Sequence, residues 1–248
     1  FKVKRDEILK AIKNVPLDLK LSIQNAKKNI KIFHEAQITK TIKVETQPGV
    51  LCWQKKIPIE RIGLYIPGGS APLFSSILML SIPAKVAKCG QVIMCSPPDA
   101  NGNLADVILY TADLCGVDEI YKIGGIQAIA AMTFGTKSIP KVDKIFGPGN
   151  QYVTVAKQLA AQHKVAIDLP AGPSELMVVA DKSANPDFIA SDLLSQAEHG
   201  PDSQVYLITN DIKIADMTIN KLKLQLNLLE RKDICLLYTS DAADETGR

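Results

Sequence analysis

Arginine and histidine are scarce in this sequence, and no hydrophobic stretch is long enough to span a bilayer. Only 4 of the 29 basic residues are arginines and the net charge is +3, whereas nucleic-acid binders rely on arginine to grip phosphates and bases. The longest apolar candidate, Ile77 to Val86, contains Pro83 and Lys85. The loose lysine cluster near the N-terminus is interpreted as a solvated helix face, with nucleic-acid binding a distant alternative. We therefore expect no nucleic-acid partner and no membrane association.

The five cysteines lack the C-x-x-C spacing that is typical of metal and redox sites. They are odd in number and scattered through apolar segments, which indicates reduced, buried thiols and a cytoplasmic protein. Cys95 ends a strand-like run, so a catalytic role for it stays open as the less favoured interpretation. With 248 residues, 46% of them hydrophobic, the chain can bury a sizeable core in one or two domains.

Short apolar segments alternate with helical ones between residues 62 and 168, and glycine or proline follows most of the apolar segments. Strands are expected over residues 62–66, 92–95, 119–123, 144–146 and 165–168. Helices are expected over residues 75–88, 104–115, 127–134 and 152–163. This alternation predicts an α/β fold with a parallel, Rossmann-like sheet. Because parallel strands need crossover connections, their carboxyl ends should share one edge of the sheet.

Two α/β domains are expected, preceded by an N-terminal helical segment. Residues 62–171 should form a continuous nucleotide-binding domain. Residues 1–61, helical and then extended from Thr41 to Pro58, should join residues 172–234 in a second, incomplete domain. In that second domain, strands are expected over 176–180 and 204–209, and helices over 186–199 and 211–229.

Three glycine-rich turns should lie on the shared edge of the predicted sheet. They are Gly68-Gly69-Ser70, Gly124-Gly125 and Gly147-Pro148-Gly149-Asn150. Glycine lets backbone amides approach a phosphate closely, and the N-terminus of the following helix favours negative charge. The G-x-G-x-x-G fingerprint is absent, so ordinary Rossmann binding is not supported. Any one turn could be purely structural, but three on one edge favour a ligand crevice. Tyr65 could form an aromatic wall there, although most strand tyrosines are packing residues.

The segment from Ser191 to Ser203 brings an amide, a carboxylate and an imidazole to the end of a predicted helix. Gln196 and His199 are three residues apart and should share a helix face, where they could hold a metal or a polar substrate. The alternative is that His199 caps the helix and Gln196 is merely solvated. A zinc hydrolase using Glu198 and His199 is disfavoured because the H-E-x-x-H spacing is absent. Ser174 lies outside any G-x-S-x-G elbow, so it either donates to a substrate or belongs to a turn.

Five long motifs, in order, resemble the histidinol dehydrogenase family. They are Ile62–Ser75, Gly124–Ala130, Val142–Asn150, Asp168–Glu175 and Ser191–Ser203. The similarity covers nearly everything to about residue 230. It implies an NAD-dependent, zinc-requiring enzyme that oxidises L-histidinol to L-histidinal and then to L-histidine, the last steps of histidine biosynthesis. It also implies a homodimer whose subunits share active-site residues.

The resemblance assigns roles to individual residues by motif. The implied NAD contacts are Tyr65, Gln127 and Asn150. The implied contacts to L-histidinol are Ser174, Gln196 and His199. Of these, Gln196 and His199 would also ligate Zn²⁺.

The family pattern includes a downstream Glu-His acid/base pair and two further zinc ligands, but no histidine follows His199 here. Two donors do not complete a four-coordinate zinc site. No catalytic residue is therefore assigned, and we expect the chain itself to be inactive, or alternatively to act as a dinucleotide-binding module without turnover. Residues 235–248 resemble a translated sequencing adapter and are interpreted as a non-native tail. The start at Phe1 fits a fragment open at both ends.

Overall fold

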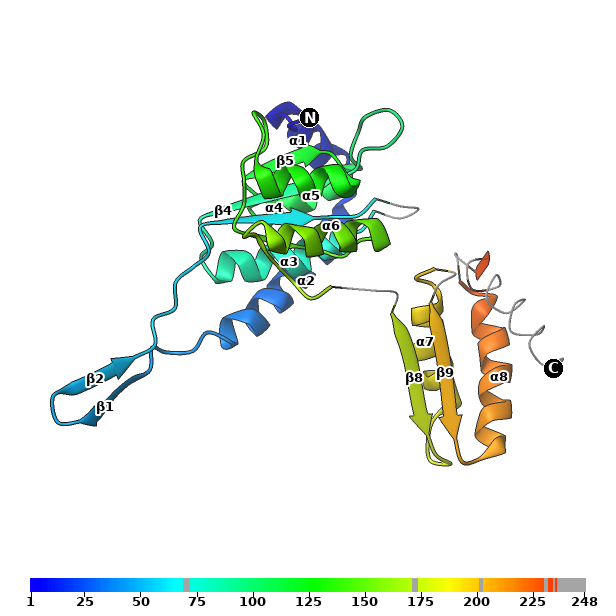
Figure 1. The fold of residues 1–248 in the computed structure, drawn as a ribbon. Coiled ribbons are helices and arrows are strands. Elements are labelled where there is room, and N and C mark those ends of the chain that lie inside the picture. Colours follow the sequence, from blue (N-terminus) through cyan, green and yellow to red (C-terminus); the bar gives the residue numbers. More distant parts are fainter. Residues whose placement is uncertain (69–71, 171–173, 201–202, 230–231, 234, 236–248) are drawn as a thin grey trace. The chain divides into compact units, whose positions relative to one another are not determined.

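Two units make up the protein, each with its own parallel sheet. The structure, a computed structural model, describes residues 1–68, 72–170, 174–200, 203–229, 232–233 and 235. Unit 1 is Phe1–Ala171 and unit 2 is Gly172–Arg248 (Figure 1). The predicted α/β class is confirmed. Among the described residues, none forms a helix that is both long enough and apolar enough to cross a membrane. The predicted tail, apart from Cys235, lies outside the described residues.

A five-stranded sheet, in which every neighbouring pair of strands is parallel, forms the centre of unit 1. The strands are β3 (Arg61–Tyr65), β4 (Gln91–Ser96), β5 (Glu119–Lys122), β6 (Lys144–Phe146) and β7 (Ala166–Ile167). Their order is β5-β4-β3-β6-β7. The chain moves outward from β3 to β5 and then returns to place β6 on the other side of β3. This reversal creates a topological switch point between the carboxyl ends of β3 and β6, where open α/β sheets bind ligands.

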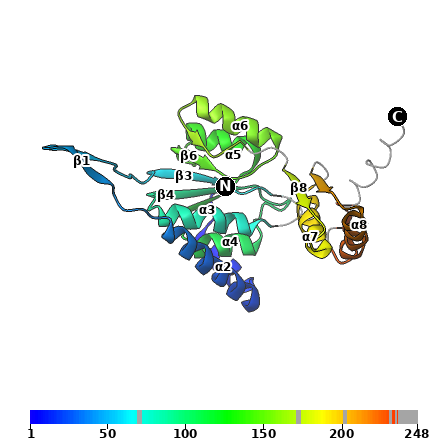
Figure 2. The same cartoon turned by 90° about the horizontal axis from the view of Figure 1, so that it is seen from below.

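Helices cover both faces of this sheet, as Figure 2 shows. One face carries α3 (Phe74–Val86) and α4 (Asp106–Leu114), and the other carries α5 (Gly125–Phe134) and α6 (Gln151–Gln162). Successive strand residues point to opposite faces. Leu64 therefore packs in the core that contains Ile77 of α3, and Tyr65 packs in the core that contains Met132 of α5. Burial on both faces explains why the strands read as unbroken apolar runs.

The N-terminal helices also pack within unit 1. They are α1 (Arg5–Asn14) and α2 (Leu17–Ala36), and Pro16 separates them. Helix α1 contacts α4, and α2 contacts α3. Ala11 and Ile23 are buried in these contacts because each lies on the apolar side of its helix. Residues 1–61 thus lie in unit 1 together with residues 62–171. Their predicted pairing with residues 172–234 stays a prediction.

The segment between α2 and β3 forms a hairpin, in line with the extended conformation predicted for it. Strands β1 (Lys43–Gln47) and β2 (Val50–Trp53) pair antiparallel, and every residue in both is exposed. Gly49 turns the chain with a φ of +81°, and its N–H donates to Glu45 Oε1 at 2.8 Å. Trp53, the one tryptophan of the sequence, is 61% exposed.

Unit 2 contains a two-stranded parallel sheet and two helices. The elements are β8 (Glu175–Ala180), α7 (Pro186–Ala197), β9 (Gln204–Thr209) and α8 (Ile212–Leu226). Asn185 caps α7 by accepting from the Asp187 N–H at 2.9 Å, and Pro186 occupies the first turn as the sequence predicted. Side chains such as Val178 and Leu207 pack against the helices, while Val179 on the opposite face is exposed.

Candidate functional site

The predicted glycine turns, as far as they are described, gather at one edge of the unit 1 sheet; Gly69 and Ser70 lie outside the described residues. Gly68 follows β3, Gly124 follows β5 and Gly147 follows β6, and all these strands run parallel. The turns are packed so closely that side chains would not fit. A Cβ at Gly68 would lie 2.6 Å from Pro97 Cγ, and a Cβ at Gly124 would lie 2.4 Å from Pro97 Cβ. Pro97 therefore joins the turns that follow β3, β4 and β5 into one surface.

A hollow of about 470 Å³ opens at this edge, beside the ends of β3 and β4. Its lining includes Pro67, Gly68, Pro97, Pro98 and Asp99. Apolar walls with a few polar groups are typical of small-molecule sites. The hollow lies beside the ends of β3 and β4, and its lining includes none of Tyr65, Gln127 and Asn150.

Tyr65 lies at the end of β3 but is mostly a core residue, since only 4% of it is exposed. Burial raises the pKa of its phenol above the ordinary value, so the hydroxyl stays protonated. Its oxygen accepts a hydrogen bond from the Gly125 N–H at 3.0 Å. Tyr65 thus links β3 to the first residue of α5. Both roles considered from the sequence, packing and a contact at the crevice, are compatible with this placement.

The other two predicted coenzyme contacts lie at helix N-termini on the same edge. Gln127 is exposed in the first turn of α5, and its Oε1 lies 2.8 Å from where a Cβ on Gly125 would stand. Asn150 caps α6, with its Oδ1 accepting from the Val153 N–H at 3.1 Å. Helix N-termini carry partial positive charge and favour anions. Two of them therefore open onto this edge.

Sequence reasoning missed an ion pair directly beneath the turn that follows β6. Lys157 of α6 is buried, and its Nζ contacts Asp168 Oδ1 and donates to the Gly147 carbonyl at 2.7 Å. Asp168, which opens the motif Asp168–Glu175, accepts from the Gly147 N–H at 2.7 Å. The signal was present: Lys157 falls in helical register with Val153 and Ala160, the other buried residues of α6. A lysine on an apolar stripe implies a buried partner.

A catalytic role for Cys95 is not supported. Its side chain is fully buried, and burial raises the pKa of the thiol to about 12. The thiolate is the reactive form of cysteine, so at pH 8 only about one part in ten thousand of this thiol is reactive. Cys115 is buried in the same way, with its pKa raised to about 11.

These environments predict an order of thiol reactivity. In the folded protein, Cys52 of the exposed hairpin should react quickly with an aromatic disulfide reagent at pH 8, while Cys95 and Cys115 should react only after denaturant is added. Mass spectrometry of labelled peptides at timed intervals would identify each site. A Cys95 adduct appearing as fast as the Cys52 adduct would contradict the inert-thiol interpretation.

Unit 2 holds the predicted substrate and metal residues. Gln196 lies in the last turn of α7, and its Nε2 donates to the Ser174 carbonyl at 3.1 Å and to Ser203 Oγ at 3.4 Å. The structure therefore brings Ser174 and Gln196 together. Helix α7 ends at Ala197, two residues earlier than His199, which is exposed in the following turn. The His199 N–H still donates to the Gln196 carbonyl at 3.1 Å, so the two residues remain neighbours.

No complete metal centre is present among the described residues. Within the described ranges, histidine, cysteine, aspartate and glutamate side chains form no group of three or more that could hold a metal ion. Gln196 and His199 supply two donors at most, and a zinc site needs four. Zinc binding by this chain would thus need ligands from outside the described residues.

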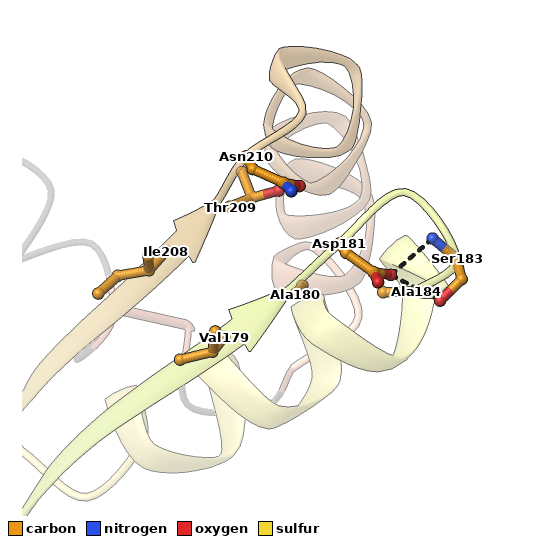
Figure 3. Close-up of a pocket in the computed structure, with 8 residues that line it drawn as sticks. All are labelled: Val179, Ala180, Asp181, Ser183, Ala184, Ile208, Thr209 and Asn210. Carbon is orange, nitrogen blue, oxygen red and sulfur yellow. Dashed lines mark hydrogen bonds between the residues drawn. The ribbon is translucent and has the colours of Figure 1, made fainter.

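A second hollow, of about 560 Å³, lies at the carboxyl ends of β8 and β9 (Figure 3). In Figure 3, Asp181 and Ser183 face one another beside the end of β8, Thr209 is the last residue of β9 and Asn210 follows it. Asp181 Oδ1 accepts from the Ser183 N–H at 2.8 Å and from Ser183 Oγ at 2.6 Å, and these hydrogen bonds lower the pKa of the carboxyl group. The carboxylate therefore stabilises its own turn, and this hollow includes none of the predicted site residues.

Comparison with known proteins identifies similar sequences and structures. A family model described as histidinol dehydrogenase matches residues 1–243. The match extends past about residue 230, where the sequence resemblance was expected to end. Histidinol dehydrogenase of Bacteroides fragilis (strain YCH46) is 58% identical over 228 residues, covering 92% of this chain and 53% of the relative. The crystal structure of histidinol dehydrogenase from Elizabethkingia anophelis is 56% identical with a TM-score of 0.92, covering 96% of this chain and 55% of that chain. This chain therefore spans about half the length of the curated relatives that it matches.

More distant structures share the fold alone. The NAD-dependent aldehyde dehydrogenase from Sinorhizobium meliloti is 15% identical with a TM-score of 0.52, and the match covers 76% of this chain and 38% of that chain. At this level of identity, likeness of architecture carries no information about substrate or cofactor.

Proposed function

The chain belongs to the histidinol dehydrogenase family, and from this premise we propose that it forms part of an enzyme that oxidises L-histidinol to L-histidine through L-histidinal, reducing two NAD⁺. The observation that supports this proposal is the switch point between β3 and β6, with glycine turns and two helix N-termini at one sheet edge. Because the chain spans about half of its relatives, the activity is proposed for the whole protein.

The carboxyl edge of unit 1 fits a dinucleotide. Gly68 and Gly124 let the turns pack directly against Pro97, and the N-termini of α5 and α6 on the same edge are where a pyrophosphate would be favoured. We propose that Tyr65, Gln127 and Asn150 hold NAD⁺ at this edge. When bound, NAD⁺ supplies the hydride acceptor, while the protein binds and orients it. Tyr65 is protonated, because burial raises its pKa, and its hydroxyl proton remains available to donate.

For the substrate, we propose that Ser174, Gln196 and His199 contact L-histidinol. The hydrogen bond from Gln196 to the Ser174 carbonyl keeps these two residues adjacent, and His199 follows directly after the helix. The described residues do not by themselves fit a four-ligand Zn²⁺ site. We therefore propose that Zn²⁺ binds at Gln196 and His199 only where residues outside the described ranges supply the remaining ligands.

The remaining features are proposed for the whole enzyme on the basis of the family. It would be a cytoplasmic homodimer acting on a small-molecule substrate. The alternative for the chain as it stands is a dinucleotide-binding module without turnover. One observation favours this alternative: the switch-point edge lies entirely within unit 1, whereas the described residues hold no complete metal centre.

The two possibilities for this chain can be separated by measuring binding and turnover side by side. We expect calorimetry to detect NAD⁺ binding, and we expect no increase in NADH absorbance at 340 nm with L-histidinol and Zn²⁺ present. The full-length Bacteroides fragilis relative is the positive control for turnover. NADH formation by the 248-residue chain would show that this chain suffices for turnover and would contradict the expectation that it is inactive. Absence of NAD⁺ binding would overturn the proposed coenzyme site.

A further inference from the structure

We propose that Lys157 and Asp168 are positioning residues that fix the Gly147 peptide groups and thereby the shape of the coenzyme loop, residues 147–150. This inference rests on the proposed NAD⁺ site at the carboxyl edge of unit 1. Neither residue needs to touch the coenzyme. They would act through the loop, which connects β6 to the N-terminus of α6 at the switch point.

Both polar backbone atoms of Gly147 are bound by this one ion pair. Lys157 Nζ donates to the Gly147 carbonyl oxygen at 2.7 Å, and Asp168 Oδ2 accepts from the Gly147 N–H at 2.7 Å. The second carboxylate oxygen, Oδ1, contacts Lys157 Nζ and closes the arrangement. The Gly147 N–H and C=O are thereby held from two different elements, α6 and the segment that follows β7.

The backbone conformation at Gly147 explains why such a restraint is useful. Its φ is +129°, in the region that favours glycine, and a Cβ there would lie 2.0 Å from the Tyr65 carbonyl oxygen. Glycine alone permits this conformation but does not enforce it, because glycine is the most flexible residue. Hydrogen bonds to both polar atoms of the residue select one conformation from the many that glycine allows.

Burial indicates that the pair serves more than general stability. The Lys157 side chain is 4% exposed and the Asp168 side chain is 28% exposed. Placing a lysine almost fully out of water carries a large desolvation penalty, and a buried ion pair often stabilises a fold no better than apolar residues of similar size. A pair directed at one glycine in a ligand-binding loop is therefore better explained by control of loop geometry.

The same sheet offers a control at its opposite edge, a chemically similar ion pair whose side chains are more exposed, at 34% for Lys85 and 40% for Asp118. Lys85 Nζ lies 2.8 Å from Asp118 Oδ2, and that oxygen accepts from the Val92 N–H at 2.7 Å. This second group also consists of a lysine, an aspartate and a backbone N–H. It lies where β4 begins, whereas the glycine turns lie at the opposite edge, where the strands end. A strand of five residues separates the two edges by about 15 Å.

The test compares NAD⁺ affinity and melting temperature in the 248-residue chain. Lys157→Met keeps the length of the side chain and removes its charge and donors, and Lys85→Met does the same at the other edge. We expect Lys157→Met to raise the Kd for NAD⁺ at least tenfold, while Lys85→Met changes it less than twofold. Both variants should lower the melting temperature, so affinity is the readout that a purely structural role would leave unchanged.

A conservative variant keeps the inference falsifiable if Lys157→Met does not fold. Asp168→Asn retains an oxygen that can accept from the Gly147 N–H, but it loses the charge and places an NH2 donor where an oxygen contacts Lys157. Its Kd should therefore lie between those of the wild type and Lys157→Met. A Kd within twofold of the wild type for both Lys157→Met and Asp168→Asn would overturn the inference while leaving the coenzyme site intact. If the wild-type chain does not bind NAD⁺, the proposed coenzyme site is wrong. That result differs from failure of the inference, in which the wild type binds NAD⁺ and the variants bind it equally well.

Discussion

Replacing Gly147 with alanine is expected to abolish measurable NAD⁺ binding and to destabilise unit 1. The new Cβ would lie 2.0 Å from the Tyr65 carbonyl oxygen, at a φ of +129° that alanine avoids. Strained backbone of this kind costs roughly 1–3 kcal/mol, and overpacking against a fixed group costs roughly 1–3 kcal/mol more. For a domain of this size, that corresponds to a fall in melting temperature of roughly 5–20 °C by circular dichroism.

Gly49→Ala is a control that separates the collision expected in Gly147→Ala from the cost of a positive φ alone. Gly49 also has positive φ, +81°, but a Cβ there would meet nothing within 4 Å. Gly49→Ala should therefore cost only about 1 kcal/mol and leave the Kd for NAD⁺ unchanged. If both variants bound NAD⁺ as tightly as the wild type, the loop after β6 would not be part of the coenzyme site.

The second large effect is expected at Gly124, where the chain passes against Pro97. Its φ of −127° suits any residue, so alanine at this position tests collision alone. A Cβ would lie 2.4 Å from Pro97 Cβ and 3.0 Å from Pro97 Cα, which is backbone and cannot rotate away. We expect Gly124→Ala to destabilise unit 1 by roughly 1–3 kcal/mol. Displacement of the α5 N-terminus should also raise the Kd for NAD⁺ at least tenfold.

Gly200 provides the matching control for Gly124. A Cβ at Gly200 would meet nothing within 4 Å, and Gly200 lies in unit 2, outside the proposed coenzyme edge. Gly200→Ala should therefore leave both the melting temperature and the Kd for NAD⁺ within error of the wild type. An equal loss of affinity in Gly124→Ala and Gly200→Ala would indicate a nonspecific effect and contradict the assignment of the edge.

The sheet of unit 1 could be predicted from the sequence because its strands carry an unusually clear signal. Strands buried on both faces, such as β3 and β4, must be apolar throughout, and glycine or proline marks where each ends. The parallel order then places Gly68, Gly124 and Gly147 on one edge without further information. Strong local patterning and simple connection rules were sufficient for this part of the fold.

Long-range contacts could not be predicted in the same way. The packing of α1 and α2 against unit 1 depends on which apolar face meets which, and many partners would satisfy an amphipathic helix. The contact between Lys157 and Asp168 joins residues from two elements, and only the register of α6 hinted at it. The end of α7 at Ala197, before His199, reflects the ordinary uncertainty of helix boundaries.

The exposed hairpin determines what tryptophan emission can report about this protein. The only indole, Trp53, projects from β2 with 61% of its surface in water, and it belongs to neither of the cores around Leu64 and Met132. Intrinsic fluorescence excited at the indole should therefore be red-shifted in the native state and change little when those cores melt. The same indole is a built-in optical probe for anything that covers the hairpin, because its emission would shift to the blue on losing water.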